Sequence, residues 1–165
     1  MHNKVKKKLL HLYTGELTAT IVFLFVWLVY LQKYEWASLS GYTAYAFILL
    51  EFILLQGTYY WYLKYNQIKH GDLGALPHRW LRLFKACKLI NVVLIVLGVP
   101  LIIVQLSSFP ANFYFFLFLY LFAIGEYINY YHIRLSYQTS EEINDWLRHK
   151  KLRSSRLARE LKKLN

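Results

Sequence analysis

Four apolar runs, each about as long as a lipid bilayer is thick, constrain this chain more than any other feature. They cover residues 14–32, 41–63, 86–106 and 111–133. A helix rises about 1.5 Å per residue, so roughly 20 residues cross the hydrocarbon core of a membrane. Because lipid offers no hydrogen bonds to the backbone, such spans are restricted to helices and closed barrels. The sequence therefore predicts an all-α polytopic membrane protein, with four transmembrane helices in an antiparallel bundle.

The first run follows a basic arm, and this combination also occurs in secretory signal peptides. The apolar core of a signal peptide is about 7–15 residues long, which is shorter than the run over 14–32. The run also continues into an aromatic, charged segment, residues 30–42, without a small-residue cleavage site. We therefore expect it to be the first span.

The chain changes character after the fourth run. Residues 1–135 are predicted to form the transmembrane domain, and residues 136–165 to form a cytoplasmic, basic amphipathic helix. In this tail, apolar residues recur at helical spacing from Ile143 to Leu164, with Arg and Lys between them. Such a helix can lie on a membrane surface and contact anionic lipid, although a solvated charged helix gives the same pattern. Its expected membrane-surface residues are Trp146, Arg148, Lys150, Lys151 and Arg153.

The basic residues indicate how the chain is oriented. Of its 20 Lys and Arg, all except Lys33 lie in the N-terminal arm, in the segment 64–88 that leads into the third run, or after the fourth run. Loops that carry Lys and Arg stay on the cytoplasmic side. We therefore predict a multi-pass cell-membrane protein with both termini in the cytoplasm. The small size, short loops and single cysteine favour a bacterial cytoplasmic membrane. The net charge of +11 is explained by this orientation and does not require nucleic acid as a partner.

One ionisable residue, Glu51, falls in the middle of a span, at the expected depth of the bilayer midplane. A charged group there costs about 2.5–3.5 kcal/mol on insertion scales, so it is a candidate functional site by default. Successive residues of a helix are rotated by about 100°. Thr58 and Tyr62 therefore share the face of Glu51 and lead from it towards the cytoplasm.

A second set of polar residues is expected at one depth, near the cytoplasmic ends of the first, third and fourth spans. We expect its two carboxylates to be neutralised by its two lysines, because buried charges are usually paired. Interhelical hydrogen bonds, and lysines that extend to the interface, are the structural alternatives. The set consists of Glu16, Lys85, Lys88, Asn91, Glu126 and Asn129.

The sequence lacks the common catalytic and metal-binding motifs. It contains no HExxH, CxxC or GxSxG, none of its six histidines forms an i, i+4 pair, and no span carries an aspartate. The single cysteine, Cys87, excludes an internal disulfide and a multi-cysteine metal site. We therefore expect neither an enzyme nor a cofactor or metal.

Two classes of function remain. The favoured one is a non-enzymatic accessory or interaction protein, whose basic cytoplasmic face contacts anionic lipid or a partner protein. The alternative is a small transporter or channel component that forms a homo-oligomer and uses Glu51 as its intramembrane proton or cation site. A lipid-modifying enzyme is a weaker alternative.

Overall fold

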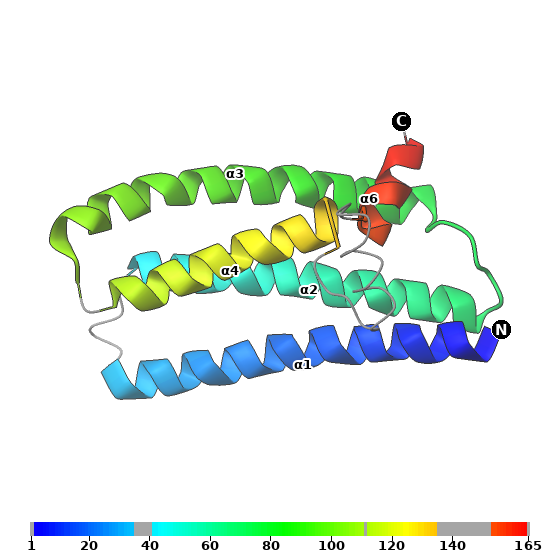
Figure 1. Ribbon diagram of the computed structural model, residues 1–165, viewed down its shortest axis with the longest axis horizontal. Helices are drawn as coiled ribbons and strands as arrows, with labels where there is room; N and C mark the ends of the chain where they lie inside the picture. Colours follow the sequence, from blue (N-terminus) through cyan, green and yellow to red (C-terminus); the bar gives the residue numbers. More distant parts are fainter. Residues whose placement is uncertain (1, 35–40, 111, 135–152, 165) are drawn as a thin grey trace, which may run out of the picture.

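The structure is a computed structural model that describes residues 2–34, 41–110, 112–134 and 153–164. These residues form four long helices, a short helix and a 3-10 turn, and they contain no β-strand (Figure 1). The elements are α1 (His2–Tyr34), α2 (Gly41–Lys69), α3 (His78–Ser108), α4 (Phe113–Tyr131), α6 (Arg156–Leu161) and η2 (Lys162–Leu164).

All four long helices have the length and apolarity needed to cross a membrane. The predictions of an all-α fold and of four candidate spans are therefore confirmed. The helices extend beyond the apolar runs, since α1 begins at His2 and α2 continues to Lys69. Beyond the second apolar run, α2 continues through residues 64–69, and Lys64 and Ile68 are buried one turn apart on this extension.

The central element is α2, which packs against α1, α3 and α4. Its side chains Leu50 and Ile53 are fully buried, as is Phe116 of the neighbouring α4. Trp27 of α1 stacks on Phe47 of α2, with 4.3 Å between the ring centres. Most of the core therefore lies around α2.

In contrast, α1 and α3 present apolar side chains outward along most of their length. Examples are Phe25 on α1 and Leu89, Val96 and Ile103 on α3, all of which are exposed. Contiguous apolar surface on this scale is unfavourable in water and favourable in lipid. These faces fit the hydrocarbon core of a bilayer.

The first turns of α1 and the α2–α3 connection lie at one end of the molecule, and α4 ends on the same side, next to α6 (Figure 1). We call this end the basic end, because it carries Lys8, Lys69, Arg82 and Arg159. The connection turns at Gly71, whose φ of 88° is a left-handed conformation that glycine adopts without strain.

The C-terminal segment packs back onto α4 at the basic end. Residues 153–155 are extended, and Ile133 and Ser154 form an isolated antiparallel bridge. The backbone N–H of Arg134 donates to the carbonyl of Arg153 at 2.9 Å, and that of Ser155 donates to the carbonyl of His132 at 3.1 Å. The prediction of one continuous amphipathic helix over 136–165 is therefore wrong at 153–155, where the backbone bonds to α4 rather than to itself.

Candidate functional site

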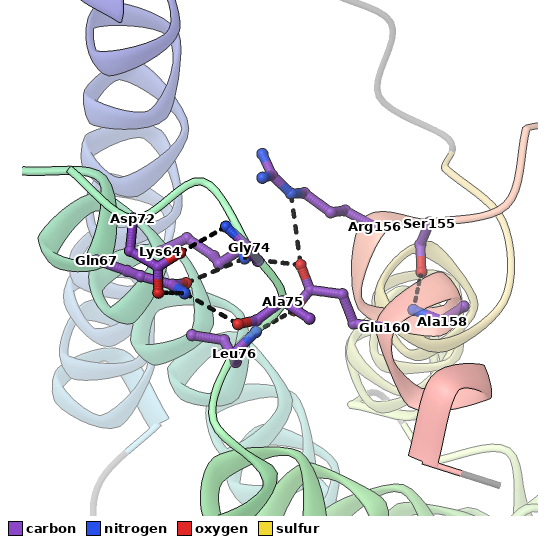
Figure 2. A network of polar contacts seen from close by, with 10 residues as sticks. All are labelled: Lys64, Gln67, Asp72, Gly74, Ala75, Leu76, Ser155, Arg156, Ala158 and Glu160. Carbon is purple, nitrogen blue, oxygen red and sulfur yellow. Dashed lines mark hydrogen bonds and ion pairs between the residues drawn. The ribbon is translucent and has the colours of Figure 1, made fainter.

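A buried ion pair fixes α6 to α2 and to the connection that follows α2. Lys64 Nζ lies 2.8 Å from Glu160 Oε1, and only 1% of the Lys64 side chain and 9% of the Glu160 side chain are exposed. Lys64 also donates to the carbonyl of Gly74 at 2.8 Å, while the second carboxylate oxygen of Glu160 accepts the N–H of Leu76 at 3.1 Å (Figure 2). Both charges are thus paired and hydrogen-bonded, which is what allows them to be buried.

A second set of bonds shapes the connection itself. Gln67 Nε2 donates to Asp72 Oδ2 at 2.8 Å and to the carbonyl of Ala75 at 2.9 Å, and the N–H of Gly74 donates to Asp72 Oδ1 at 2.7 Å (Figure 2). These donors hold the pKa of the Asp72 carboxyl below its usual range. The connection therefore presents its carbonyls to Lys64 in a defined conformation.

Ser155 connects α6 to α4. Its hydroxyl donates to the carbonyl of Tyr130, and it accepts the N–H of Ala158 at 3.0 Å. The second bond is an N-cap, in which a serine side chain satisfies an N–H that has no partner within the helix. Side chains and backbone together therefore set the position of α6.

Sequence reasoning missed Lys64 and Glu160, because one directly follows an apolar run and the other lies in the charged tail, where charged residues are common. One signal was present: Glu160 is the only acidic residue between Asp145 and the C-terminus, within a strongly basic stretch. The sequence could not show which cation pairs with Glu160, since residues 64–88 alone contain six Lys and Arg.

Between α1, α2, α4 and the docked α6 lies a cavity of about 230 Å³. Its basic lining residues come from three segments: Lys8 from α1, Arg134 from the residues that follow α4, and Arg156 and Arg159 from α6. Glu16 is its one acidic lining residue among those that the structure describes. The remaining described lining is mostly apolar or aromatic: Val5, Leu9, Leu12, Tyr60, Trp61, Asn129, Tyr130, Ser155 and Leu157.

The structure brings part of the predicted polar layer together beside this cavity. The Tyr130 hydroxyl donates to Glu16 and also interacts with Glu126, whose Oε2 accepts a bond from Asn129 Nδ2 at 3.2 Å. Glu16, Glu126 and Asn129 therefore form one cluster, with Tyr130 joining α4 to α1.

The two predicted lysines lie elsewhere. Lys85 and Lys88 line a separate cavity of about 330 Å³ between α3 and α6, together with His132. Partial burial and the charge of Lys88 lower the pKa of His132. The expected pairing of these lysines with Glu16 and Glu126 is not seen in the part of the chain that the structure describes.

The sixth predicted residue, Asn91, belongs to an amide pair between α2 and α3. Asn91 and Gln56 exchange hydrogen bonds of 2.8 and 3.1 Å, and the hydroxyl of Tyr131 from α4 donates to Gln56 Oε1 at 2.6 Å. Since all three side chains are buried, this set acts as a polar link between three spans.

Two of the three residues in the predicted stripe on α2, Thr58 and Tyr62, contact α1. Glu51 is buried, with 8% of its surface exposed, and its Oε1 atom has no hydrogen-bond partner among the described residues. The hydroxyl of Thr58 lies 3.5 Å from that of Thr20. Tyr62 is more exposed and packs against Tyr13, with ring centres 5.8 Å apart.

Of the predicted membrane-surface residues, Trp146, Arg148, Lys150 and Lys151 lie outside the described residues. Arg153 is exposed, and its carbonyl takes part in the pairing with α4. Within the described ranges, no three His, Cys, Asp or Glu side chains gather as a possible metal site.

Together these features define a helical protein with four candidate membrane spans and a polar, basic end closed by a docked terminal helix. No family model, curated protein or solved structure matches the chain.

Proposed function

We propose that this protein is a non-enzymatic integral membrane protein of the accessory or interaction type, whose basic end contacts anionic lipid or an acidic partner protein. The supporting observation is that basic side chains line the two cavities described above and a third one between the α2–α3 connection and α6. They come from α1, α3, the residues after α4 and the C-terminal segment. These side chains are Lys8, Lys85, Lys88, Arg134, Arg156, Arg159, Lys162 and Lys163.

The proposal includes an orientation. The four spans form an antiparallel bundle in the cell membrane, with the basic end and both termini in the cytoplasm. The positions of the N-terminus, the α2–α3 connection and α6 at one end support this orientation (Figure 1), because Lys and Arg are retained on the cytoplasmic side.

Lipid preference in nanodiscs tests the proposal. The full chain is reconstituted with phosphatidylglycerol and phosphatidylcholine, and the lipid next to the protein is measured with spin-labelled analogues of each. We expect phosphatidylglycerol to be enriched at low salt and less so at high salt, since salt screens exposed charges. Equal amounts of both lipids at every salt concentration would contradict lipid contact.

One observation favours a second candidate, a proton- or cation-translocating oligomer. Glu51 is a buried carboxylate with an unpartnered oxygen among the described residues, and such a group is costly unless it binds something. On this hypothesis, proton or cation flux into liposomes is lost in Glu51→Gln and retained in Glu16→Gln. Flux that survives in Glu51→Gln excludes this role for Glu51.

A further inference from the structure

We infer that the cavity between α1, α4 and α6 is a binding site for one anionic phospholipid, with the phosphate at its basic rim and an acyl chain on its apolar wall. This inference deepens the proposed function and rests on it. It adds a specific site to what would otherwise be general attraction between a basic surface and an anionic membrane.

The rim of the cavity has the chemistry of a phosphate site. Arg134, Arg156 and Arg159 carry planar guanidinium groups, which bind phosphate oxygens in pairs, and Lys8 adds a point charge from the opposite helix. Arg156 lies 3.6 Å from Glu160 and is partly neutralised by it. Cationic groups from α1, from the residues after α4 and from α6 therefore line the same cavity.

One acidic residue, Glu16, also lines the cavity. The Glu16 carboxylate accepts the hydroxyl of Tyr130, so part of its hydrogen-bonding capacity is used within the protein. Against this one carboxylate, the described lining carries four basic residues. The balance favours a ligand with negative charge.

The other side of the cavity is apolar. Leu9 and Leu12 of α1, Trp61 of α2 and Leu157 of α6 line it. At about 230 Å³ the cavity is smaller than common small-molecule pockets, which enclose roughly 300–1,000 Å³. It thus suits a phosphate and the first part of a chain, with the rest of the lipid running along the exposed apolar face of α1.

The position of the cavity matches the place of a lipid headgroup. It lies where α1 changes from its lysine-rich first turns to its apolar body, beside Trp61 and Tyr60. Tryptophan and tyrosine concentrate at this depth of a membrane. A headgroup in the adjacent leaflet would therefore reach the rim without leaving the bilayer surface.

The site is complete only while α6 is docked. Arg156, Leu157 and Arg159 all come from α6, and Lys64–Glu160 and Ser155 hold this helix in place. This explains how a charged tail can supply a shaped site rather than a diffuse basic surface.

Native mass spectrometry of the full chain tests the headgroup half of the site. Dioleoyl phosphatidylglycerol is the probe, and dioleoyl phosphatidylcholine, which is zwitterionic, is the reference. We expect one retained phosphatidylglycerol and roughly hundredfold weaker retention in Arg134→Ala/Arg159→Ala, because each of the two lost charge-assisted bonds is worth about one factor of ten. The control Lys69→Ala/Arg82→Ala removes the same charge outside the cavity and should retain the lipid as the wild type does.

A second pair of variants tests the acyl half. Leu12→Trp fills the cavity without changing charge, whereas Leu10→Trp places the same ring on an exposed position of the same helix. We expect Leu12→Trp alone to weaken retention. If Arg134→Ala/Arg159→Ala fails to fold, Arg159→Glu replaces it, since Arg159 is exposed and its reversal should weaken retention at least as strongly.

Three results would overturn the inference. If both double variants lose phosphatidylglycerol equally, the attraction is diffuse. If free glycerol phosphate binds as tightly as the lipid and Leu12→Trp has no effect, the ligand is a soluble phosphate. Unchanged retention in every variant would place the lipid elsewhere.

The nanodisc experiment separates a failure of this inference from a failure of the proposed function. Enrichment of phosphatidylglycerol that persists in Arg134→Ala/Arg159→Ala overturns the site alone, whereas no enrichment in the wild type overturns both.

Discussion

Several tyrosine hydroxyls inside the helix bundle join one helix to another. Tyr130 of α4 bonds to Glu16 of α1, Tyr131 of α4 bonds to Gln56 of α2, and Tyr120 of α4 bonds to the carbonyl of Ile95 in α3. Tyrosine is usually expected at the membrane interface, where its ring and hydroxyl are both satisfied. Here tyrosine hydroxyls bond to polar groups of neighbouring spans. The tyrosines inside the bundle therefore have a structural role.

Tyr130 can reach Glu16 because its ring lies against Gly57 of α2. A Cβ atom at Gly57 would overlap the ring, whereas one at Gly125 would meet nothing within 4 Å. The ring is buried and hydrogen-bonded, so it cannot move aside at low cost. We expect Gly57→Ala to destabilise the protein by about 1–3 kcal/mol through overpacking.

The control for Gly57→Ala is Gly125→Ala, which should be neutral or slightly stabilising because alanine has the higher helix propensity. Reversible unfolding in mixed micelles gives the free energy of unfolding of each variant. A Gly57→Ala variant as stable as Gly125→Ala would show that α2 and α4 are not in such close contact.

His132 gives the basic end a dependence on pH. Its folded-state pKa lies below the ordinary value of 6.5, so the folded state favours the neutral ring. The stabilisation is present above pH 6.5 and decreases as the pH falls below it. The His132 side chain lines a cavity together with Lys88 and with Ala158 and Leu161 of α6, so a positive charge gained in acid should loosen the attachment of α6.

Hydrogen exchange of the α6 amides, corrected for intrinsic rates, measures this effect between about pH 7.5 and pH 5.5. We expect protection to fall with pH in the wild type and to fall less in His132→Gln. His70→Gln, an exposed histidine on the α2–α3 connection, is the control. An identical decline in all three proteins would contradict the role of His132.

At the scale of elements, α6 illustrates how a helix of only six residues keeps one position. So short a helix is not stable alone. Its stability comes from the Ser155 cap, the buried Leu157 and Leu161, and the Lys64–Glu160 pair. Docking of α6 is thus decided mainly by contacts outside the helix.

Removing one partner of the buried ion pair should therefore undock α6. Lys64→Met leaves Glu160 without its closest cation, and a buried unpaired charge of this kind costs about 3–5 kcal/mol. Trypsin should then cleave at Arg156 and Arg159 much faster than in the wild type. Lys69→Met, an exposed substitution on the same helix, should leave the rate unchanged.

The double variant Lys64→Met/Glu160→Leu separates charge from packing. It removes both charges, so we expect cleavage slower than in Lys64→Met, since an apolar pair of similar size can replace a buried ion pair. Cleavage in Lys64→Met at the wild-type rate would mean that the pair does not hold α6.

At the scale of the whole molecule, the two ends of the bundle differ in charge. The basic end carries the α2–α3 connection and α6, while α3 and α4 meet at the opposite end near Phe109 (Figure 1). Under the proposed orientation, the first end faces the cytoplasm and the second faces outward.

Single cysteines test this orientation in cells. In a Cys87→Ala background, Leu73→Cys marks the basic end and Phe109→Cys the opposite end, and both positions are about equally exposed, at 62% and 59%. We expect a membrane-impermeant maleimide added outside to label Phe109→Cys only. Labelling of Leu73→Cys in intact cells would reverse the orientation.

The sequence by itself determined the helical class, the four candidate spans and the uneven distribution of charge. These are local properties: about twenty apolar residues in a row suffice for a span, and the count of Lys and Arg beside it needs no knowledge of neighbours.

Tertiary structure decided which of these residues meet. The pairing of Lys64 with Glu160, the bond from Tyr130 to Glu16 and the bonds among Gln56, Asn91 and Tyr131 all depend on how far each helix is rotated about its axis. The cavity depends on where α6 docks. Helical periodicity shows which residues share a face. Which faces come together is fixed only by packing between helices, because that packing depends on contacts between residues distant in the chain.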